Sequence, residues 1–198
     1  MKKRVVAIVG SYRKGGTTDR AVEAVLEGAR SGGAETRTFF LREQHIEFCI
    51  NCRECMQQPG PRRGKCVQQD DLEPMLQEIE AADAVVLASP VNCYNVTAIF
   101  RRMMERLVGA AYWPWGQNVP SPRTTETKRK AVLIASSAMP GLLIPLATGA
   151  ARALKVTAQL LGAKPVGRLW IGLAAGEPHH ALSVRTVARA KRMGMKLA

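Results

Sequence analysis

The chain has 198 residues, the length of one ordinary domain, and is 46% hydrophobic and 23% charged. This composition excludes a disordered chain, and no stretch approaches the ~20 consecutive apolar residues that a membrane-spanning helix needs. The net charge of +13 favours acidic or polyanionic partners through its field but says nothing about the fold.

The N-terminal segment predicts a strand. Residues 5–9 form a short apolar run rich in β-branched side chains, which is typical of a strand buried on both faces. Although Met1–Arg4 is basic, the apolar run is too short for a secretory signal peptide, so we expect a cytoplasmic protein without a membrane partner.

A polar loop and an amphipathic helix come next. Apolar residues recur at helical spacing from Ala21 to Ala29, Gly32 and Gly33 end the helix, and Thr17 or Thr18 is expected to cap its start. The loop itself carries glycines, hydroxyls and two cations, in the order Gly10-Ser11-Tyr12-Arg13-Lys14-Gly15-Gly16-Thr17-Thr18.

The rest of the chain continues the alternation of strands and helices. Asp70 and Glu73 resemble a capping box at the start of one helix. Strands are expected at 35–41, 84–89, 131–136 and 165–171, and helices from 70, from 96 to 107, at 143–161 and at about 178–197. This predicts an α/β flavodoxin-like three-layer sandwich with a five-stranded parallel sheet in the order 2-1-3-4-5. We expect a single domain over 1–198, with a cysteine-rich insertion at about 44–69.

The first loop suits a phosphate group. It lacks both the dinucleotide-binding and the P-loop glycine spacings, but backbone N–H groups at a helix N-terminus bind anions. Ser11, Thr17 and Thr18 can donate hydrogen bonds to phosphate oxygens, Gly16 allows close approach, and Arg13 can pair with the phosphate or with the polar edge of a ring. The alternative is an ordinary strand-to-helix turn with threonine caps.

Four of the five cysteines are clustered. Cys49, Cys52, Cys55 and Cys66 fall within 18 residues, and the odd total argues against a disulfide framework. A Cys-x2-Cys-x2-Cys run can wrap an iron–sulfur cubane such as a 4Fe-4S cluster, whereas zinc more often uses two separated pairs. Redox-active or vestigial thiols are the third interpretation. The insert 57–64 would have to bulge for Cys66 to join the others.

Taken in order, these motifs resemble the NADPH-dependent FMN reductase family. The first loop is similar to that family's Gly-Ser-Pro-Arg-x-x-Gly-x-Thr signature, with Tyr12 in place of proline, and the resemblance covers residues 4 to about 109. The segment CINCREC resembles the iron–sulfur flavoprotein branch, although the gap before Cys66 is longer than usual there.

The resemblance implies FMN as cofactor and assigns ring-binding roles. It places Pro90, Val91, Asn92, Cys93, Tyr94 and Asn95 along the isoalloxazine and puts Ser136 in a loop that closes one side. Physically, we expect Cys93 to be a small buried hydrophobe, with a flavin-proximal redox thiol as the alternative, and Asn95 to cap the following helix.

The implied function is an FMN-dependent oxidoreductase that transfers electrons between NAD(P)H or a reduced carrier and a small acceptor, with an iron–sulfur cluster as relay. An acidic ferredoxin-type donor would suit the charge, and the family is usually dimeric or tetrameric. No catalytic acid or base is required. The rivals are a flavodoxin-like electron carrier and a redox-responsive regulatory module, although no nucleic-acid motif is present.

Two further features are left open by the sequence. Arg185, Arg189, Arg192 and Lys196 recur at helical spacing, which indicates a solvated face or a docking face for an acidic protein, and His179 and His180 are expected at the surface. Trp113 and Trp115 are expected to pack at a subunit interface or over the flavin.

Overall fold

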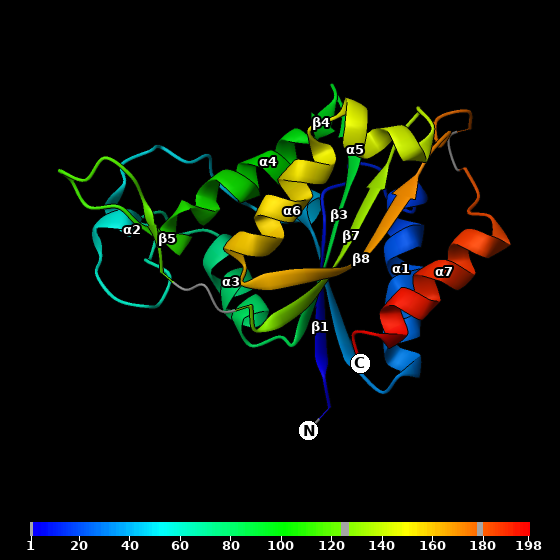
Figure 1. The fold of residues 1–198 in the computed structure, drawn as a ribbon, viewed down its shortest axis with the longest axis horizontal. Coiled ribbons are helices and arrows are strands. Elements are labelled where there is room, and N and C mark those ends of the chain that lie inside the picture. The colour runs from blue at the N-terminus through cyan, green and yellow to red at the C-terminus, as the bar shows by residue number, and fades with distance from the viewer. Residues whose placement is uncertain (1, 124–126, 178–179) are drawn as a thin grey trace.

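The computed structural model describes residues 2–123, 127–177 and 180–198, and shows a parallel sheet between two layers of helices (Figure 1). The five main strands run in the order β2-β1-β3-β7-β8 and all pair in parallel, which confirms the predicted flavodoxin-like topology. Their bounds are β1 Arg4–Val9, β2 Glu35–Phe40, β3 Ala84–Asn92, β7 Arg129–Ser136 and β8 Ala163–Ile171; the two-residue strand β4 (Asn95–Val96) folds back antiparallel on β3.

Helices cover both faces of this sheet. One face carries α1 (Thr17–Ser31) and α7 (Val184–Met195), and the other carries α3 (Leu72–Glu80), α4 (Ala98–Glu105) and α6 (Ala150–Leu160). The connections contain the short elements η1 (Leu41–Glu43), α2 (Glu54–Gln57), η2 (Arg106–Ala110), β5 (Ala111–Tyr112), β6 (Ser121–Pro122), η3 (Gly141–Leu143) and α5 (Ile144–Ala147). No helix among the described residues is long and apolar enough to cross a membrane.

The central strands are buried because side chains on both of their faces enter a core. Ile8, Leu87 and Leu133 pack under α3, α4 and α6, whereas their neighbours Ala7 and Val86 pack under α1 and α7. Such two-sided burial requires continuous apolar sequence rather than alternation, which is why these strands could be predicted.

Two predicted helices begin or end elsewhere. The helix expected over 143–161 breaks into α5 and α6 at Gly149, whose N–H donates to the carbonyl of Tyr94 at 2.8 Å. The last helix begins at Val184, where Ser183 accepts a hydrogen bond from the N–H of Thr186. His180 is half-buried, and His179 lies outside the described residues.

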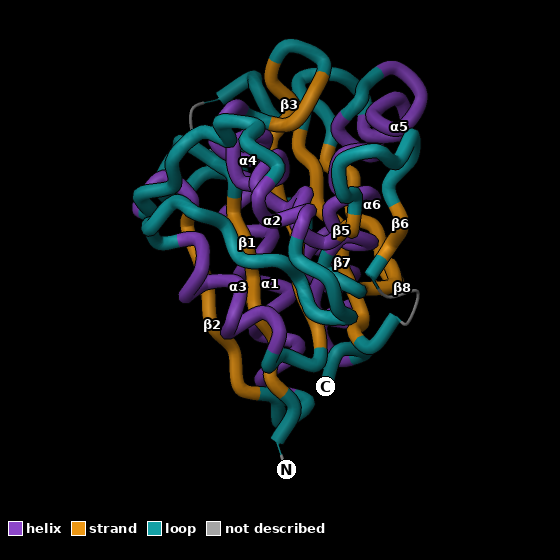
Figure 2. The backbone as a smooth tube through the Cα atoms, turned by 90° about the vertical axis from the view of Figure 1, so that its left-hand side faces the viewer, coloured by secondary structure: helices purple, strands orange, loops and turns teal. Residues whose placement is uncertain are grey.

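The cysteine-bearing segment lies at one end of the molecule, beside the β5–β6 hairpin (Figure 1, left). The loops at the carboxyl ends of the strands lie at the end opposite the chain termini (Figure 2). These two regions contain all the residues for which the sequence predicts cofactor binding.

Candidate functional site

Three loops at the carboxyl ends of β1, β3 and β7 are tied to one another by hydroxyl groups. The buried Thr97 donates from Oγ1 to the carbonyl of Gly10 at 2.6 Å and from its N–H to Ser89 Oγ at 3.1 Å. On the other side, Thr18 Oγ1 lies 2.8 Å from Ser136 Oγ, and both side chains are buried. The predicted ligand loops therefore form one connected edge.

The first loop ends at a helix N-terminus with no side-chain cap. The N-cap of α1 is Gly16, so the expectation that Thr17 or Thr18 caps the helix is wrong. Thr17 donates instead to the carbonyl of His180 at 3.3 Å, and Thr18 faces Ser136. The unused N–H groups and the helix dipole favour an anion at this position, which fits the phosphate of FMN.

Positive side chains surround this helix end. Arg13 is exposed and, among residues 2–123, 127–177 and 180–198, forms no ion pair. Ser11 is buried, and its Oγ accepts a hydrogen bond from the N–H of Arg13 at 3.2 Å, so it shapes the loop. Lys14 is exposed as well. The loop can thus bring cations to a bound phosphate without breaking an ion pair.

The first loop is also held by an ion pair that the sequence did not reveal. Arg42 Nη2 lies 3.1 Å from Asp19 Oδ2, with both side chains nearly buried, and Arg42 Nη1 donates to the carbonyl of Ser11 at 3.2 Å. Asp19 also accepts from the N–H of Gly15 at 2.9 Å, where the backbone has a φ of +67°. The pair therefore holds the loop at two points.

The second loop is a tight hairpin between β3 and β4. Its two central residues, Cys93 and Tyr94, have φ angles of +45° and +59°, the backbone of a two-residue turn. Cys93 is exposed, so the expectation that it is a buried hydrophobe is wrong: a turn tip points away from the core. Tyr94 is 70% exposed, which leaves its ring free to cover a ligand.

The remaining residues of this loop divide between packing and exposure. Pro90 and Val91 are half-buried, and Asn92 is exposed. Asn95 does not cap α4, contrary to expectation, because it lies in β4 and its Oδ1 accepts from the N–H of Val96. The cap is Thr97, whose Oγ1 accepts from the N–H of Phe100 at 3.3 Å. The ring contacts of these residues stay predictions.

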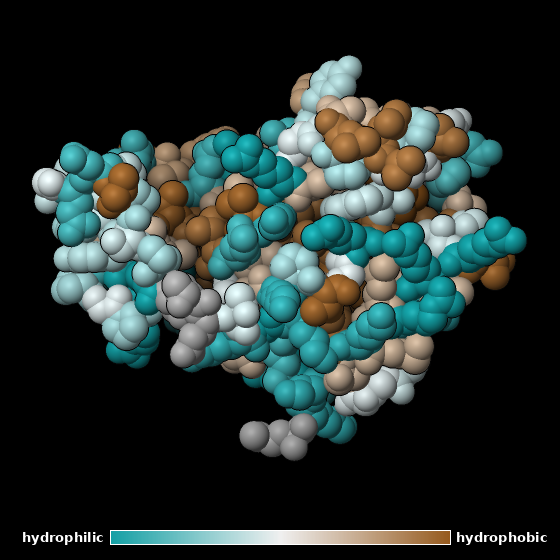
Figure 3. All heavy atoms as spheres, viewed as in Figure 1, coloured by the Kyte–Doolittle hydropathy of each residue, from teal (hydrophilic) through white to brown (hydrophobic). Residues whose placement is uncertain are grey.

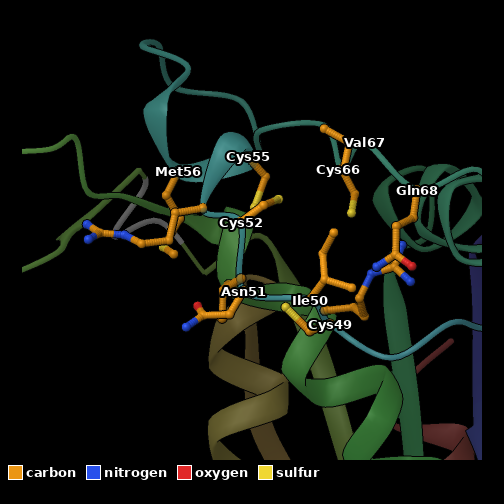
Figure 4. A pocket seen from close by; sticks show the side chains of 12 residues that line it. Cys49, Ile50, Asn51, Cys52, Cys55, Met56, Cys66, Val67 and Gln68 are labelled. Atoms are coloured by element: carbon orange, nitrogen blue, oxygen red, sulfur yellow. The ribbon is translucent and has the colours of Figure 1, made fainter.

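The four clustered cysteines line one pocket, together with Arg53 and Arg106 (Figure 4). Cys49 and Cys52 come from the chain before α2, Cys55 lies in α2, and Cys66 returns from the long insert. Their sulfur atoms face the space between these segments (Figure 4). The insert therefore bulges and returns Cys66 to the other three cysteines, as predicted.

Electrostatics show that the thiols are crowded. Burial raises the pKa of the Cys55 thiol, and the neighbouring Cys66, Cys49 and Cys52 raise it further. The buried Nε atoms of Arg53 and Arg106 have no hydrogen-bond partner. A cluster would bind these thiols as thiolates, and the Nε–H groups of Arg53 and Arg106, which have no other partner, would then be available to donate to the sulfur atoms. Within the described residues, however, no three His, Cys, Asp or Glu side chains are arranged to hold a metal ion, so the pocket supplies the donor chemistry of a cluster site without its final geometry.

A buried ion pair fixes the base of the cysteine segment. Arg106 Nη1 lies 2.6 Å from Asp70 Oδ2, and the two side chains are 1% and 0% exposed. Burial opposes ionisation of Asp70, but hydrogen bonds from Arg106 and from the backbone of Glu47 and Leu72 outweigh it and lower the pKa of the carboxyl.

Only part of the predicted capping box forms. Asp70 Oδ1 accepts a hydrogen bond from the N–H of Leu72 at 3.1 Å while Oδ2 pairs with Arg106, but Glu73 forms a two-point pair with Arg63, at 3.0 Å for each contact. The N-cap position of α3 belongs to Asp71, which provides no side-chain cap. Arg63 has thus replaced the local partner expected for Glu73, whereas the local hydrogen bond to Asp70 is kept.

The two tryptophans pack on the cysteine segment. The Arg53 guanidinium carbon lies 4.3 Å from the ring centroid of Trp113 and 4.0 Å from that of Trp115. Arg53 Nη2 also donates to the carbonyl of Trp113 at 2.9 Å. The loop after β5 thereby stabilises the left-handed turn at Arg53, where φ is +64°.

Helix α4 connects the two regions. It begins after Thr97, which binds the first loop, and ends before Arg106, which lines the cysteine pocket. Nine residues of helical rise correspond to about 13 Å along the axis. The two predicted cofactor sites are therefore neighbours within one chain.

Comparison with solved structures supports the fold. The chain is similar to an NAD(P)H:quinone oxidoreductase from Methanothermobacter marburgensis, with a TM-score of 0.71, 20% identity and full coverage of both chains. It also resembles a flavodoxin from the domain Archaea, with a TM-score of 0.56, 12% identity and coverage of 98% and 95%.

Comparison of sequences identifies the family. An iron-sulfur flavoprotein of Archaeoglobus fulgidus is 32% identical over 111 residues, 56% of this chain and 48% of the relative. One of Methanosarcina thermophila is 31% identical over 105 residues, 53% and 52% of the two chains. The chain thus spans about half the length of these relatives. The family model described as NADPH-dependent FMN reductase matches residues 3–176, and the chain belongs to that family.

Proposed function

We propose that this protein binds FMN at the three connected loops and transfers electrons between NAD(P)H or a reduced carrier and a small acceptor. The observation that carries the proposal is the uncapped N-terminus of α1, beside Arg13 and within the edge formed by Thr97 and Thr18. The family model supports the choice of FMN.

The bound flavin would supply the hydride and electron chemistry. The protein's own residues have other tasks. The N-terminus of α1 and Arg13 bind the phosphate, and the hairpin at Cys93 and Tyr94 covers one side of the ring. The ties through Thr97 and Ser136 keep the loops at a fixed separation, which reduces the entropy lost when the cofactor binds.

We also propose that Cys49, Cys52, Cys55 and Cys66 hold an iron–sulfur cluster. The donor set, four thiols around one pocket with Arg53 and Arg106 at its wall, supports this, and so do the names of the relatives. When bound, the cluster would pass single electrons to and from the flavin. The two arginines would balance the negative charge of the thiolates.

Anaerobic purification tests both proposals. We expect yellow protein with one FMN per chain, and additional brown absorbance with iron and sulfide if the cluster is present. Riboflavin, which lacks the phosphate, should bind more weakly than FMN, and Arg13→Ala should narrow that difference. A colourless protein that binds no added FMN contradicts the flavin proposal, and yellow protein without iron contradicts the cluster alone.

The distribution of charge supports an acidic donor protein. Residues 127–198 contain twelve Lys and Arg but only one acidic residue, Glu177, so they supply +11 of the net +13. Arg185, Arg189 and Arg192 are exposed on α7, Lys196 is exposed directly after it, and Arg168 and Lys164 are exposed on the adjoining strand β8. We propose that the acidic carrier docks on this basic face.

A homo-oligomer is also proposed. Leu142 and Leu146 are 80% and 79% exposed, and hydrophobic residues gather at the end of the molecule that carries α5 (Figure 3). Adjacent exposed leucines of this kind mark a contact surface. Sedimentation of Leu142→Ser with Leu146→Ser should show smaller particles than the parent protein; unchanged sedimentation contradicts this contact.

The rival function is an electron carrier without its own substrate. Steady-state assays separate the two: an enzyme oxidises NADPH or NADH when a quinone or free flavin is present, whereas a carrier does so only with a separate reductase. The fold alone does not discriminate between an enzyme and a carrier, because flavodoxins and quinone oxidoreductases share it.

A further inference from the structure

One arginine outside the cysteine pocket binds three backbone carbonyls around it. Arg123, which follows β6, donates from Nε to Gly109, from Nη1 to Gly60 and from Nη2 to Cys55, each at 2.9 Å. These carbonyls belong to η2, to the tip of the long insert and to helix α2. A single guanidinium therefore joins three segments that are distant in sequence.

Two glycines allow these segments to meet. A Cβ on Gly64 would lie 1.8 Å from the carbonyl oxygen of Cys55, and a Cβ on Gly109 would lie 2.7 Å from the carbonyl oxygen of Gly64. The N–H of Gly64 donates to the carbonyl of Gly109 at 3.0 Å, the same carbonyl that Arg123 binds. Backbone approach this close excludes any side chain at either position.

The insert is closed on itself just before Cys66. Gln58 Nε2 donates to the carbonyl of Lys65 at 3.0 Å, and Gln58 Oε1 accepts from the N–H of Lys65 at 2.9 Å. Arg63 pairs with Glu73 and Glu80 of α3, at 3.0 Å for each contact. Lys65, which precedes Cys66, is thus held by Gln58 near the start of the insert, and Arg63 anchors the end of the insert to α3.

We infer that Arg123 is a positioning residue for Cys55 and Cys66, acting with Gly64 and Gly109 to bring the two ends of the insert together. This inference rests on the proposed cluster for its functional meaning but not for its structural content. By binding Gly60 and Cys55 with separate nitrogen atoms, Arg123 holds the tip of the insert against α2, and the loop then returns Cys66 to the other three thiols.

The geometry requires arginine rather than any cation. A planar guanidinium has five donors in fixed directions, whereas a lysine ammonium is a single point charge on a flexible stem. Arg123→Lys should therefore rescue only part of the effect of Arg123→Ala. Arg30→Ala is a matched control, since Arg30 also bonds two side chains, Glu23 and Thr36, but lies at the end of α1.

The first measurement needs no metal. In chelator-treated protein, iodoacetamide alkylation of Cys55 is followed by peptide mass spectrometry, with the exposed Cys93 as internal reference. Cys55 is only 8% exposed in the intact structure. We expect Arg123→Ala to speed its alkylation about 10-fold relative to Cys93 as the segment opens more often. Arg123→Lys should be intermediate and Arg30→Ala unchanged.

The second measurement is iron and sulfide per chain after anaerobic purification, which should fall in Arg123→Ala while FMN content and thermal unfolding of the remaining fold change little. Unchanged alkylation overturns the inference, and so does unchanged iron in the variant when the parent protein is loaded. If the parent protein itself contains no iron, the proposed cluster fails, and the alkylation rate alone decides whether Arg123 orders the segment.

Discussion

Arg106 and Asp70 form an ion pair that is almost completely excluded from solvent, although 36 residues separate them in sequence. Arg106 also donates to the carbonyl of Glu47 at 2.8 Å, and Asp70 accepts from the N–H of Glu47. The pair therefore joins the end of α4, the start of α3 and the first residues of the cysteine segment. Breaking it affects all three.

Replacement of Arg106 by alanine should lower the free energy of unfolding by about 3–5 kcal/mol, because the Asp70 carboxylate is left buried without a partner. Urea unfolding measures this. The matched control is Arg101→Ala, which removes an exposed ion pair with Glu105 and should cost less than about 1 kcal/mol. If both variants lost the same free energy of unfolding, burial would not be the reason why the Arg106–Asp70 pair matters.

The same pair should make stability depend on acidity. The pKa of Asp70 is lower in the folded protein than in the unfolded chain, so its contribution is complete above about pH 4 and is lost as the pH falls through the folded value. Asp70→Asn should flatten this part of the curve of unfolding free energy against pH. A curve of unchanged slope below pH 4 would show that other carboxyls dominate.

Thr18→Val should weaken FMN binding about 10-fold, since it removes the hydroxyl tie to Ser136 at the helix N-terminus. The control is Thr157→Val, because Thr157 is also buried and donates to the carbonyl of Ala153 at 2.9 Å, but within α6. Both variants should lose similar stability, and only the first should lose affinity in fluorescence titrations. If Thr18→Val and Thr157→Val bind FMN equally tightly, the phosphate does not bind at this helix N-terminus.

The cysteines provide their own matched pair. Cys66→Ser should remove most iron and the brown absorbance, because three thiolates and a hydroxyl bind a cluster poorly. Cys93→Ser should leave iron unchanged, since Cys93 lies on the β3–β4 hairpin rather than at the pocket. Both variants should keep FMN. Iron that survives in Cys66→Ser would exclude this thiol as a ligand.

Charge reversal on α7 tests the docking face. The combined substitution of Arg185, Arg189 and Arg192 by glutamate should slow reduction by an acidic carrier at least about 10-fold at low salt. The difference should shrink as ionic strength rises, because exposed charges are screened. Stopped-flow measurements with a reduced ferredoxin-type protein give the rate. NADPH oxidation should be unaffected, and a salt-independent defect would contradict docking on this face.

The strands and the position of the ligand loops could be predicted because their signals are local. Burial on both faces requires continuous apolar runs such as residues 5–9. The start of a helix after a glycine-rich loop can be recognised from neighbouring residues alone. Caps were predicted less well. Thr17, Asp70 and Asn95 have the side chains of good caps. In the folded chain, however, Thr17 and Asn95 bind other partners, and Asp70 divides its carboxylate between Leu72 and Arg106.

The arginines of the site could not be found from sequence. Arg42, Arg106 and Arg123 act on residues 23 to 68 positions away, and no periodicity or motif distinguishes them from the other basic residues. Gly64 and Gly109 are visible in the sequence, but only the structure shows the close backbone contact that requires a glycine at each position.

Because α4 runs from the loops at the carboxyl ends of the strands to the cysteine pocket, the length of this one helix sets the spacing of the two regions. Adding a single residue to that helix would rotate its far end by about 100° and advance it by about 1.5 Å. Arg106 would then turn away from Asp70. A change in the length of this helix would therefore separate Arg106 from Asp70 and alter the distance between the two regions.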